Sequence, residues 1–313
     1  MSTPYASEAF LHQLLGKALA AQASDIHLKV GQPPGARVRG DLVYFRVEKI
    51  KPEDTDALAR VLLGVSSGRP LLEGCEERTI AYQVPGLGRF RVTLFRQRGS
   101  LSLVMRSIPL KVPTLVELGV PAAVGALIDG GAGLVVVAGG AAQGKTSTLA
   151  ALIGQVNESL PRQVITLEDP IEFVHEDSRA GMCQREVGTD VESFAVGLRG
   201  ALLQDPDLVM VDGLGAPEAA EAAVEVVEAS RLVLASLPAA DVSRALGRLL
   251  VGQAHEMRER VVESLRAVVA QRLVPRRDGL GFVLMSELLV LDAALRTALL
   301  WPEGGAAGRA ALI

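Results

Sequence analysis

Residues 133–147 constrain the fold of this 313-residue chain more than any other stretch of its sequence. They read GLVVVAGGAAQGKTS, an apolar, largely β-branched run followed at once by the pattern G-x-x-x-x-G-K-T. The residues that come next, 147–152, favour a helix. A strand, a glycine-rich loop and a helix in this order form the context of a phosphate-binding P-loop. The alternative is a glycine-rich turn without a ligand, which the strand–helix context disfavours.

The chemistry of such a loop assigns roles to its residues. Backbone N–H groups and the helix N-terminus hold phosphate oxygens, the lysine reaches the β- and γ-phosphates, and the next hydroxyl binds Mg²⁺. Lys145 and Thr146 take the last two roles in this chain. We therefore predict a nucleotide and Mg²⁺ as cofactors. The predicted nucleotide-binding residues are Gly139, Gly140, Ala141, Ala142, Gln143, Gly144, Lys145, Thr146 and Ser147.

Carboxylates follow two further apolar runs. Glu168 ends the run 163–168 and Asp169 follows it directly, while Asp212 ends the run 208–212. Ligands bind outside the carboxyl ends of parallel strands, so these side chains are expected to face the nucleotide. Glu168 could deprotonate an attacking water, and Asp212 could hold Mg²⁺ together with Thr146. The alternatives are a strand-end turn stopped by Pro170 and a buried strand that merely ends in Asp.

Composition narrows the remaining possibilities. A net charge of −4 and a pI near 5.7 argue against nucleic acid as the main partner. Cys75 and Cys183 are far apart and lack metal-ligand spacing, which favours buried thiols in a reducing cytosol. No apolar run reaches the roughly 18 residues that span a bilayer, and the start lacks the pattern of a signal peptide. We expect a cytoplasmic protein without direct membrane insertion, held at a membrane only through partners.

The first third of the chain predicts a small α+β domain built on an antiparallel sheet. Its expected helices are 6–22 and 51–63, the second with Pro52 in its first turn. Its expected strands are 23–30, 36–42, 78–84, 88–95 and 101–108. Pro109 and Pro113 stiffen the segment that follows, so a linker is expected there.

Beyond this linker the pattern changes to alternating strands and helices. Strands are expected at 134–138, 163–168, 208–212 and 231–236, with helices at 145–160 and 217–230. Apolar strands between helices predict a parallel sheet covered on both faces. After residue 241 we expect helices at 242–253, 256–272 and 292–300, a short piece at 282–291 and a frayed tail at 301–313. The predicted domains are 1–112, 113–241 and 242–313.

Five arginines cluster in the first domain. They are Arg89, Arg91, Arg96, Arg98 and Arg106. On alternating strands such a set is typical of a solvated sheet face. The functional alternative is a guanidinium surface aimed at phosphates, including those of a neighbouring subunit.

Taken together, these segments resemble the GspE/PilT superfamily of secretion ATPases, and within it the PilT-like motors of type IV pilus retraction. Besides the P-loop, the segments that carry the resemblance are 23–28, 88–92, 95–99, 106–109, 166–175, 184–188, 198–199, 205–207 and 294–299. The resemblance implies a PAS-like N-terminal domain, a RecA-like ATPase domain with a helical C-terminal part, and a hexameric ring that binds ATP between subunits. It also implies that Glu168 is the catalytic base and that Arg89, Arg91, Arg96 and Arg98 reach the nucleotide.

The chain departs from this family pattern at several positions. The Walker B glutamate is replaced by Gly213 and the arginine after it by Gly215. In the His box, Pro238 and Arg231 stand at the two histidine positions. The P-loop interior is Gly-Ala-Ala-Gln rather than Pro-Thr-Gly-Ser, and an alanine at 142 costs about 1 kcal/mol if that residue needs a positive φ. These changes weaken the hydrolytic machinery more than the binding loop.

Two functions stay open on this basis. One is a motor with weakened ATP hydrolysis that drives pilus retraction. The other is a nucleotide-binding auxiliary subunit, or a structural ring component, working beside an active paralogue. A small-molecule kinase is a weaker candidate, since no acceptor pocket or lid is recognisable. Expected partners are further copies of the chain, a paralogous ATPase and an inner-membrane pilus or secretion platform protein. Whether force would extend or retract a pilus, and in which system, is open.

Overall fold

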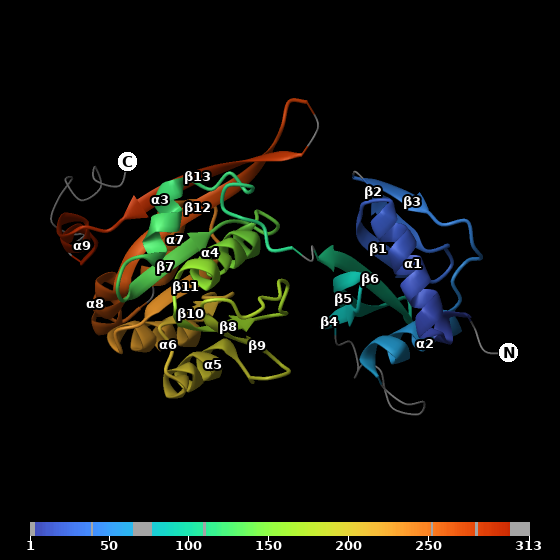
Figure 1. The fold of residues 1–313 in the computed structure, drawn as a ribbon, viewed down its shortest axis with the longest axis horizontal. Helices are drawn as coiled ribbons and strands as arrows, with labels where there is room; N and C mark the ends of the chain where they lie inside the picture. The colour runs from blue at the N-terminus through green and yellow to red at the C-terminus, as the bar shows by residue number, and fades with distance from the viewer. Residues whose placement is uncertain are drawn as a thin grey trace. The chain divides into compact units, whose positions relative to one another are not determined.

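The computed structural model describes residues 4–38, 40–64, 77–108, 111–251, 253–278 and 281–300. The chain divides into two compact units, Met1–Leu110 and Lys111–Ile313 (Figure 1). Each unit has its own sheet and its own hydrophobic core, so each is described by itself.

The first unit contains a six-stranded antiparallel sheet with the strand order β3-β2-β1-β6-β5-β4. A short 3₁₀ turn, Pro4–Ala6, precedes it. The elements of this unit are α1 (Glu8–Ala20), β1 (Ala23–Lys29), β2 (Gly35–Val38), β3 (Asp41–Tyr44), α2 (Pro52–Leu63), β4 (Arg78–Val84), β5 (Gly88–Gln97) and β6 (Ser100–Ile108).

Helices α1 and α2 cover one face of this sheet because their apolar positions recur at helical spacing. Leu11, Leu15 and Leu58 are fully buried against alternate residues of β5, among them Phe90 and Val92. Pro52 begins α2, where its missing N–H group costs nothing. On β5 the intervening residues face the opposite side, since successive side chains of a strand alternate.

The second unit contains a seven-stranded sheet with the order β13-β12-β7-β11-β10-β8-β9. All its neighbouring strands are parallel except β12 and β13, which form an antiparallel pair. The strands are β7 (Gly133–Ala138), β8 (Gln163–Glu168), β9 (Gly181–Glu186), β10 (Leu208–Val211), β11 (Leu232–Leu237), β12 (Leu265–Pro275) and β13 (Phe282–Val290). The α-helices are α3 (Ala122–Gly125), α4 (Lys145–Ser159), α5 (Phe194–Ala201), α6 (Pro217–Glu228), α7 (Val242–Leu250), α8 (His255–Ser264) and α9 (Ala293–Leu300).

Helices pack on both faces of this sheet, as the continuous apolar strands predict. One core joins α3 and α4 to the side chains of Val135 and Val137. The other joins α5, α6, α7 and α8 to Leu134 and Val136. All six residues of β7 are buried, which places the strand before the P-loop in the middle of the unit. An α+β unit followed by a three-layer α/β unit is the predicted fold class.

Two elements were predicted wrongly. The single strand expected at 36–42 is instead two strands, β2 and β3, which pair antiparallel with each other. The expected helix at 256–272 ends at Ser264, and the chain continues as β12, which pairs with β7. Short apolar runs do not distinguish a helix from a buried strand by periodicity, and here pairing with β7 decided in favour of the strand. The piece at 282–291 is β13, and β9 and α5 were not predicted. The subdivision at residue 241 stays a prediction, although β12 and β13 continue the sheet of the P-loop strand.

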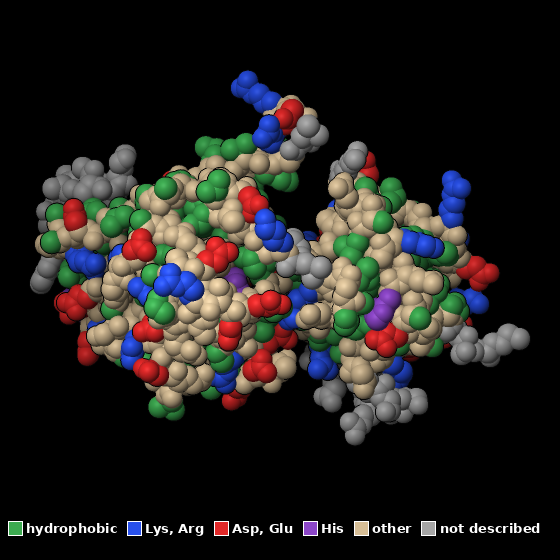
Figure 2. Space-filling view, viewed as in Figure 1, with side chains coloured by type: hydrophobic (Ala, Val, Ile, Leu, Met, Phe, Trp, Pro, Cys, Tyr) green, Lys and Arg blue, Asp and Glu red, His purple; other side chains and the backbone are tan. Residues whose placement is uncertain are grey.

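The β12–β13 hairpin extends from the edge of this sheet (Figure 1). Phe282 and Met285 on β13 are 63% and 60% exposed. Figure 2 shows apolar side chains along this hairpin and charged ones at its tip. Cys75 and the tail at 301–313 lie outside the described residues. Within the described part of the chain, no helix is both long and apolar enough to cross a bilayer.

Candidate functional site

The predicted P-loop connects the carboxyl end of β7 to the first turn of α4. The Gly139 N–H donates to the Leu237 carbonyl of β11 at 3.2 Å. A Cβ at Gly139 would lie 3.0 Å from the Gln271 carbonyl oxygen, so a larger residue there would require the backbone of β12 to shift. Gly144 has φ +83° and precedes α4, which has no side-chain cap at its N-terminus. The first N–H groups of α4 therefore point into the loop as donors for an anion.

Ala142 adopts φ +56°, the left-handed region that the sequence analysis considered for this position. A residue with a Cβ pays about 1–2 kcal/mol there relative to right-handed backbone. The loop thus keeps the P-loop path although alanine replaces the usual glycine.

Lys145, Thr146 and Asp212 lie together at this edge of the sheet. The Thr146 hydroxyl donates to Asp212 Oδ2 at 3.0 Å, and Lys145 Nζ donates to the Gly140 carbonyl at 2.9 Å. Burial lowers the pKa of Lys145, and the nearby Asp212 carboxylate opposes that shift. The lysine thus bonds to its own loop, from which a phosphate could recruit it.

Glu168 ends β8, which is separated from β7 by β11 and β10, and it is only 2% exposed. Its Oε1 accepts hydrogen bonds from Thr166 Oγ1 at 2.7 Å and from Gln184 Nε2 at 3.0 Å. The pKa of Glu168 is raised to about 7. Burial is the main cause and the charge of Asp212 adds to it, while the hydrogen bonds from Thr166 and Gln184 oppose the shift. A buried carboxyl that titrates near neutral pH is suited to general base catalysis.

Gln184 lies in segment 184–188, which carries part of the family resemblance, but the sequence did not predict a role for its side chain. Its Nε2 donates to both Glu168 Oε1 and the Phe173 carbonyl, and its Oε1 accepts from the His175 N–H at 2.8 Å. The amide therefore holds the Glu168 carboxylate against the segment that follows β8. Only the parallel pairing of β8 with β9 brings residue 184 beside residue 168.

These residues fit a nucleotide with a divalent cation. Loop, lysine and helix N-terminus suit phosphates, while Thr146 and Asp212 offer two oxygens to a cation. The described residues contain no group of three or more His, Cys, Asp or Glu side chains suited to a metal. A cation at this edge would therefore need phosphate oxygens and water as further ligands.

At the same sheet edge, two side chains of the family pattern are missing near the ends of β10 and β11. Gly213 follows Asp212 directly, and a Cβ there would lie 2.7 Å from Phe194 Cε2. Pro238 follows β11 and is exposed, with neither an N–H group nor a titratable side chain. The positions where the family pattern has a glutamate and a histidine therefore offer no polar side chain to a phosphate.

The arginines predicted for catalysis belong to the first unit. Arg89 and Arg91 share one face of β5, whereas Arg96 has the opposite parity, and Arg98, with φ +50°, lies in the turn before β6. Arg91 is directly opposite Arg106 on β6, and Arg106 Nε donates to Asp25 Oδ1 at 2.9 Å. The sequence cluster is thus divided among two faces and a turn.

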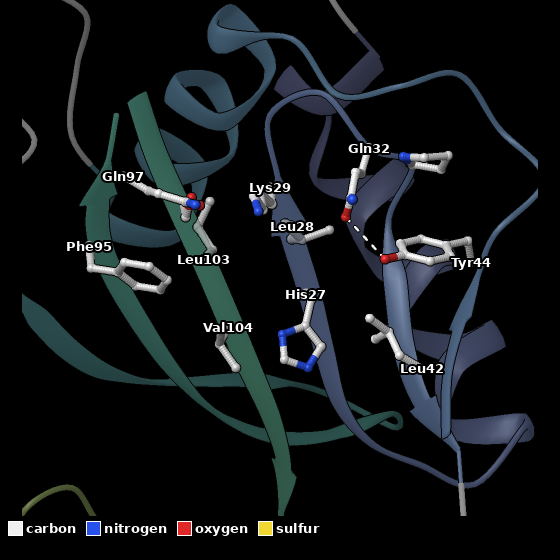
Figure 3. A pocket seen from close by; sticks show the side chains of 12 residues that line it. His27, Leu28, Lys29, Gln32, Leu42, Tyr44, Phe95, Gln97, Leu103 and Val104 are labelled. Atoms are coloured by element: carbon white, nitrogen blue, oxygen red, sulfur yellow. Dashed lines mark hydrogen bonds between the residues drawn. The ribbon is translucent and has the colours of Figure 1, made fainter. Parts of the chain in front are cut away.

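The face that bears Arg91 is the one that α1 and α2 leave open. A hollow of about 330 Å³ lies on it, lined by His27, Tyr44, Phe95, Gln97 and Val104 among others. Figure 3 shows these side chains projecting from strands of the sheet, and Tyr44 Oη donates to Gln32 Oε1 at 3.1 Å. Tyr44 and Gln32 both line this hollow.

The fold and the loop together define a two-domain P-loop ATPase. A family model described as "Type II/IV secretion system protein" matches residues 5–279. The type IV pilus retractation ATPase PilT of Pseudomonas aeruginosa is 34% identical over 288 residues, which are 91% of this chain and 83% of that protein. The type IV pilus ATPase PilU of the same organism is 34% identical over 271 residues, 85% and 71% of the two chains.

Solved structures agree with these relatives. A crystal structure of the pilus retraction motor PilT with bound ADP superposes with a TM-score of 0.85 at 33% identity, covering 94% of this chain and 86% of that one. The Legionella pneumophila ATPase DotB gives 0.77 at 27% identity, covering 96% and 85%. The chain belongs to the type II/IV secretion ATPase family, the GspE/PilT superfamily. The predicted fold class, a PAS-like α+β domain followed by a RecA-like ATPase domain, is thereby confirmed.

Proposed function

We propose that this protein binds ATP and Mg²⁺ and works as a PilT-like motor of a type IV pilus or a type II secretion-like system, with weakened hydrolysis that drives pilus retraction. The main support is that the P-loop, the Thr146–Asp212 hydrogen bond and the buried Glu168 lie at one sheet edge. Similarity to a retraction motor of known structure supports this reading.

The residues divide into binding and catalytic groups. Gly139 to Ser147 would hold the phosphates, with Lys145 donating to them, and Thr146 and Asp212 would hold Mg²⁺, which supplies charge neutralisation when bound. Glu168 would accept a proton from the attacking water at a carboxylate oxygen. Arg89, Arg91, Arg96 and Arg98 would stabilise phosphate charge from a neighbouring subunit of a ring.

Hydrolysis is expected to be slow because two contributors are missing. Gly213 offers no second carboxylate beside Asp212, and Pro238 offers no donor to the γ-phosphate. Losing one such contribution commonly costs 10²–10⁴-fold in rate. Asp212 and Glu168 retain a route to turnover, since one can hold the cation and the other can take the proton.

A second function is favoured by the same depletion. With Gly213 and Pro238 in these places, the chain could bind nucleotide and turn it over negligibly, as an auxiliary or structural subunit beside an active paralogue. The two functions share the P-loop and differ in whether Glu168 is used.

The proposed setting follows from the relatives. We infer a hexameric ring of this chain, alone or with a paralogous ATPase, in the cytoplasm at the inner membrane. The contact there would be a pilus or secretion platform protein rather than the bilayer itself, and no nucleic acid would be involved. The net charge of −4 agrees with the last point.

The deciding experiment measures phosphate release by the purified protein and by Lys145→Ala. Release by the wild type that exceeds the variant by tenfold or more supports the motor. Release equal to the variant, with ADP still bound in calorimetry, supports the auxiliary subunit. Absence of nucleotide binding contradicts both and leaves the structural ring component, which needs no nucleotide.

A further inference from the structure

The P-loop is tied to β12 by the side chain and the backbone of Gln143. The Leu273 N–H donates to Gln143 Oε1 at 2.7 Å, and Gln271 Nε2 donates to the Gln143 carbonyl at 2.7 Å. Gln271 is 3% exposed, so one anchor of this tie is buried in the unit. We call these two hydrogen bonds the β12 tether.

The tether exists because β12 lies beside β7. In the parallel register Ala270 is opposite Ala138, the last residue of β7. The next residues of β12, from Gln271 onward, therefore run alongside the loop that begins at Gly139. A Cβ on Gly139 would meet the Gln271 carbonyl at 3.0 Å, which shows how closely β12 approaches the loop.

The tethered residue is the neighbour of the strained one. Ala142, with φ +56°, is followed directly by Gln143. An alanine that is free to relax leaves the left-handed region, and the loop then loses the shape in which its N–H groups converge. A loop held at Gln143 cannot relax in this way without breaking the bond to the Leu273 N–H.

We propose that Gln143 is a positioning residue for nucleotide binding: the β12 tether holds the P-loop in its phosphate-ready shape despite alanine at 142. The strain of the left-handed alanine then lowers the free energy of unfolding and does not weaken nucleotide binding. This inference rests on the proposed nucleotide site. It assigns the glutamine in the loop interior a compensating role for the alanine before it.

The test is a double-mutant cycle on residues 142 and 143. Gln143→Met keeps the length of the side chain and removes its hydrogen bond, while Ala142→Gly removes the strain. ADP affinity by calorimetry and the midpoint of thermal unfolding are measured for the wild type, both single variants and the double variant. Gln253→Met, the same substitution between α7 and α8, is the matched control.

The proposal predicts a non-additive result. Gln143→Met weakens ADP binding about five- to tenfold, because binding must then restore the left-handed alanine and order the loop. In the Ala142→Gly background the same substitution weakens binding only about twofold. Ala142→Gly alone raises the unfolding midpoint, because it removes the strain of the left-handed alanine. The control leaves the affinity unchanged.

Two affinity results would contradict the proposal. One is an unchanged ADP affinity in Gln143→Met, and the other is an equal loss of affinity from this substitution in the wild-type and Ala142→Gly backgrounds. If the wild type binds no ADP at all, the proposed function fails and the unfolding midpoints alone judge the tether. Ala142→Gly should then stabilise the tethered protein more than the Gln143→Met protein, and equal stabilisation of both contradicts the proposal.

Discussion

The two sides of one sheet edge differ in which residues of the family pattern they keep. On the side of β7 and α4, Gly139, Gly144, Lys145 and Thr146 remain, and their geometry is that of a phosphate-binding loop. On the side of β10 and β11, Gly213 and Pro238 replace the groups that the family pattern uses in hydrolysis. We therefore expect binding and turnover to be separable in this chain, because different strands supply the residues proposed for each.

Glu168 belongs to the side of β10 and β11. It ends β8, keeps hydrogen bonds from Thr166 and Gln184, and lies near enough to Asp212 for that charge to raise its pKa. In the proposed mechanism, turnover depends on this one carboxyl, and the following variants test the difference between the two sides.

The largest effect is expected from the binding side. Lys145→Ala should lower ADP affinity and phosphate release by about 10²-fold or more, since it removes the cation that meets the phosphates. Calorimetry and a phosphate-release assay measure the two quantities. Lys111→Ala, a change of the exposed lysine that pairs with Glu117, is the control and should leave both unchanged.

Glu168→Gln should separate the two sides most cleanly. Phosphate release falls by about 10²–10³-fold because the proton acceptor is lost, while ADP affinity stays within about twofold. Glu158→Gln, a change of an exposed carboxylate in the last turn of α4, should alter neither. An unchanged release rate in Glu168→Gln would mean that another group, or none, acts as base.

The pH dependence of turnover should report the same carboxyl. The pKa of Glu168 is raised to about 7, mainly by burial, and the base must be deprotonated to act. The rate should therefore rise with pH, by about tenfold between pH 6 and pH 8. Glu168→Gln should lack this rise in its residual activity. A rate that is flat over this range contradicts the assignment.

Restoring the missing carboxylate should have the smallest effect. Gly213→Glu is expected to raise turnover only a few-fold, since the new Cβ would lie 2.7 Å from Phe194 Cε2 and the ring must move aside. Combining it with Phe194→Leu should raise turnover further, and Phe194→Leu alone should not. If the turnover of neither Gly213→Glu nor the double variant exceeds that of the wild type, the missing glutamate is not the limiting defect.

Much of this site could be predicted because its residues are contiguous. Strand, loop and helix follow one another in residues 133–159, so the P-loop and the roles of Lys145 and Thr146 are local properties of the sequence. Glu168 and Asp212 were found because carboxyl ends of parallel strands meet at one edge. The strand β12 was missed because its apolar run fits a helix equally well until it pairs with β7.

The sequence by itself therefore determined the class of fold, the phosphate-binding loop and the places where hydrolytic groups are missing. Only the tertiary structure decided which distant residues support that loop. Gln184 reaches Glu168 through the pairing of β8 with β9, and Gln271 and Leu273 reach Gln143 through the pairing of β12 with β7. The reason is physical: a motif specifies its own backbone, whereas hydrogen bonds between strands depend on a register that forms only when the sheet assembles.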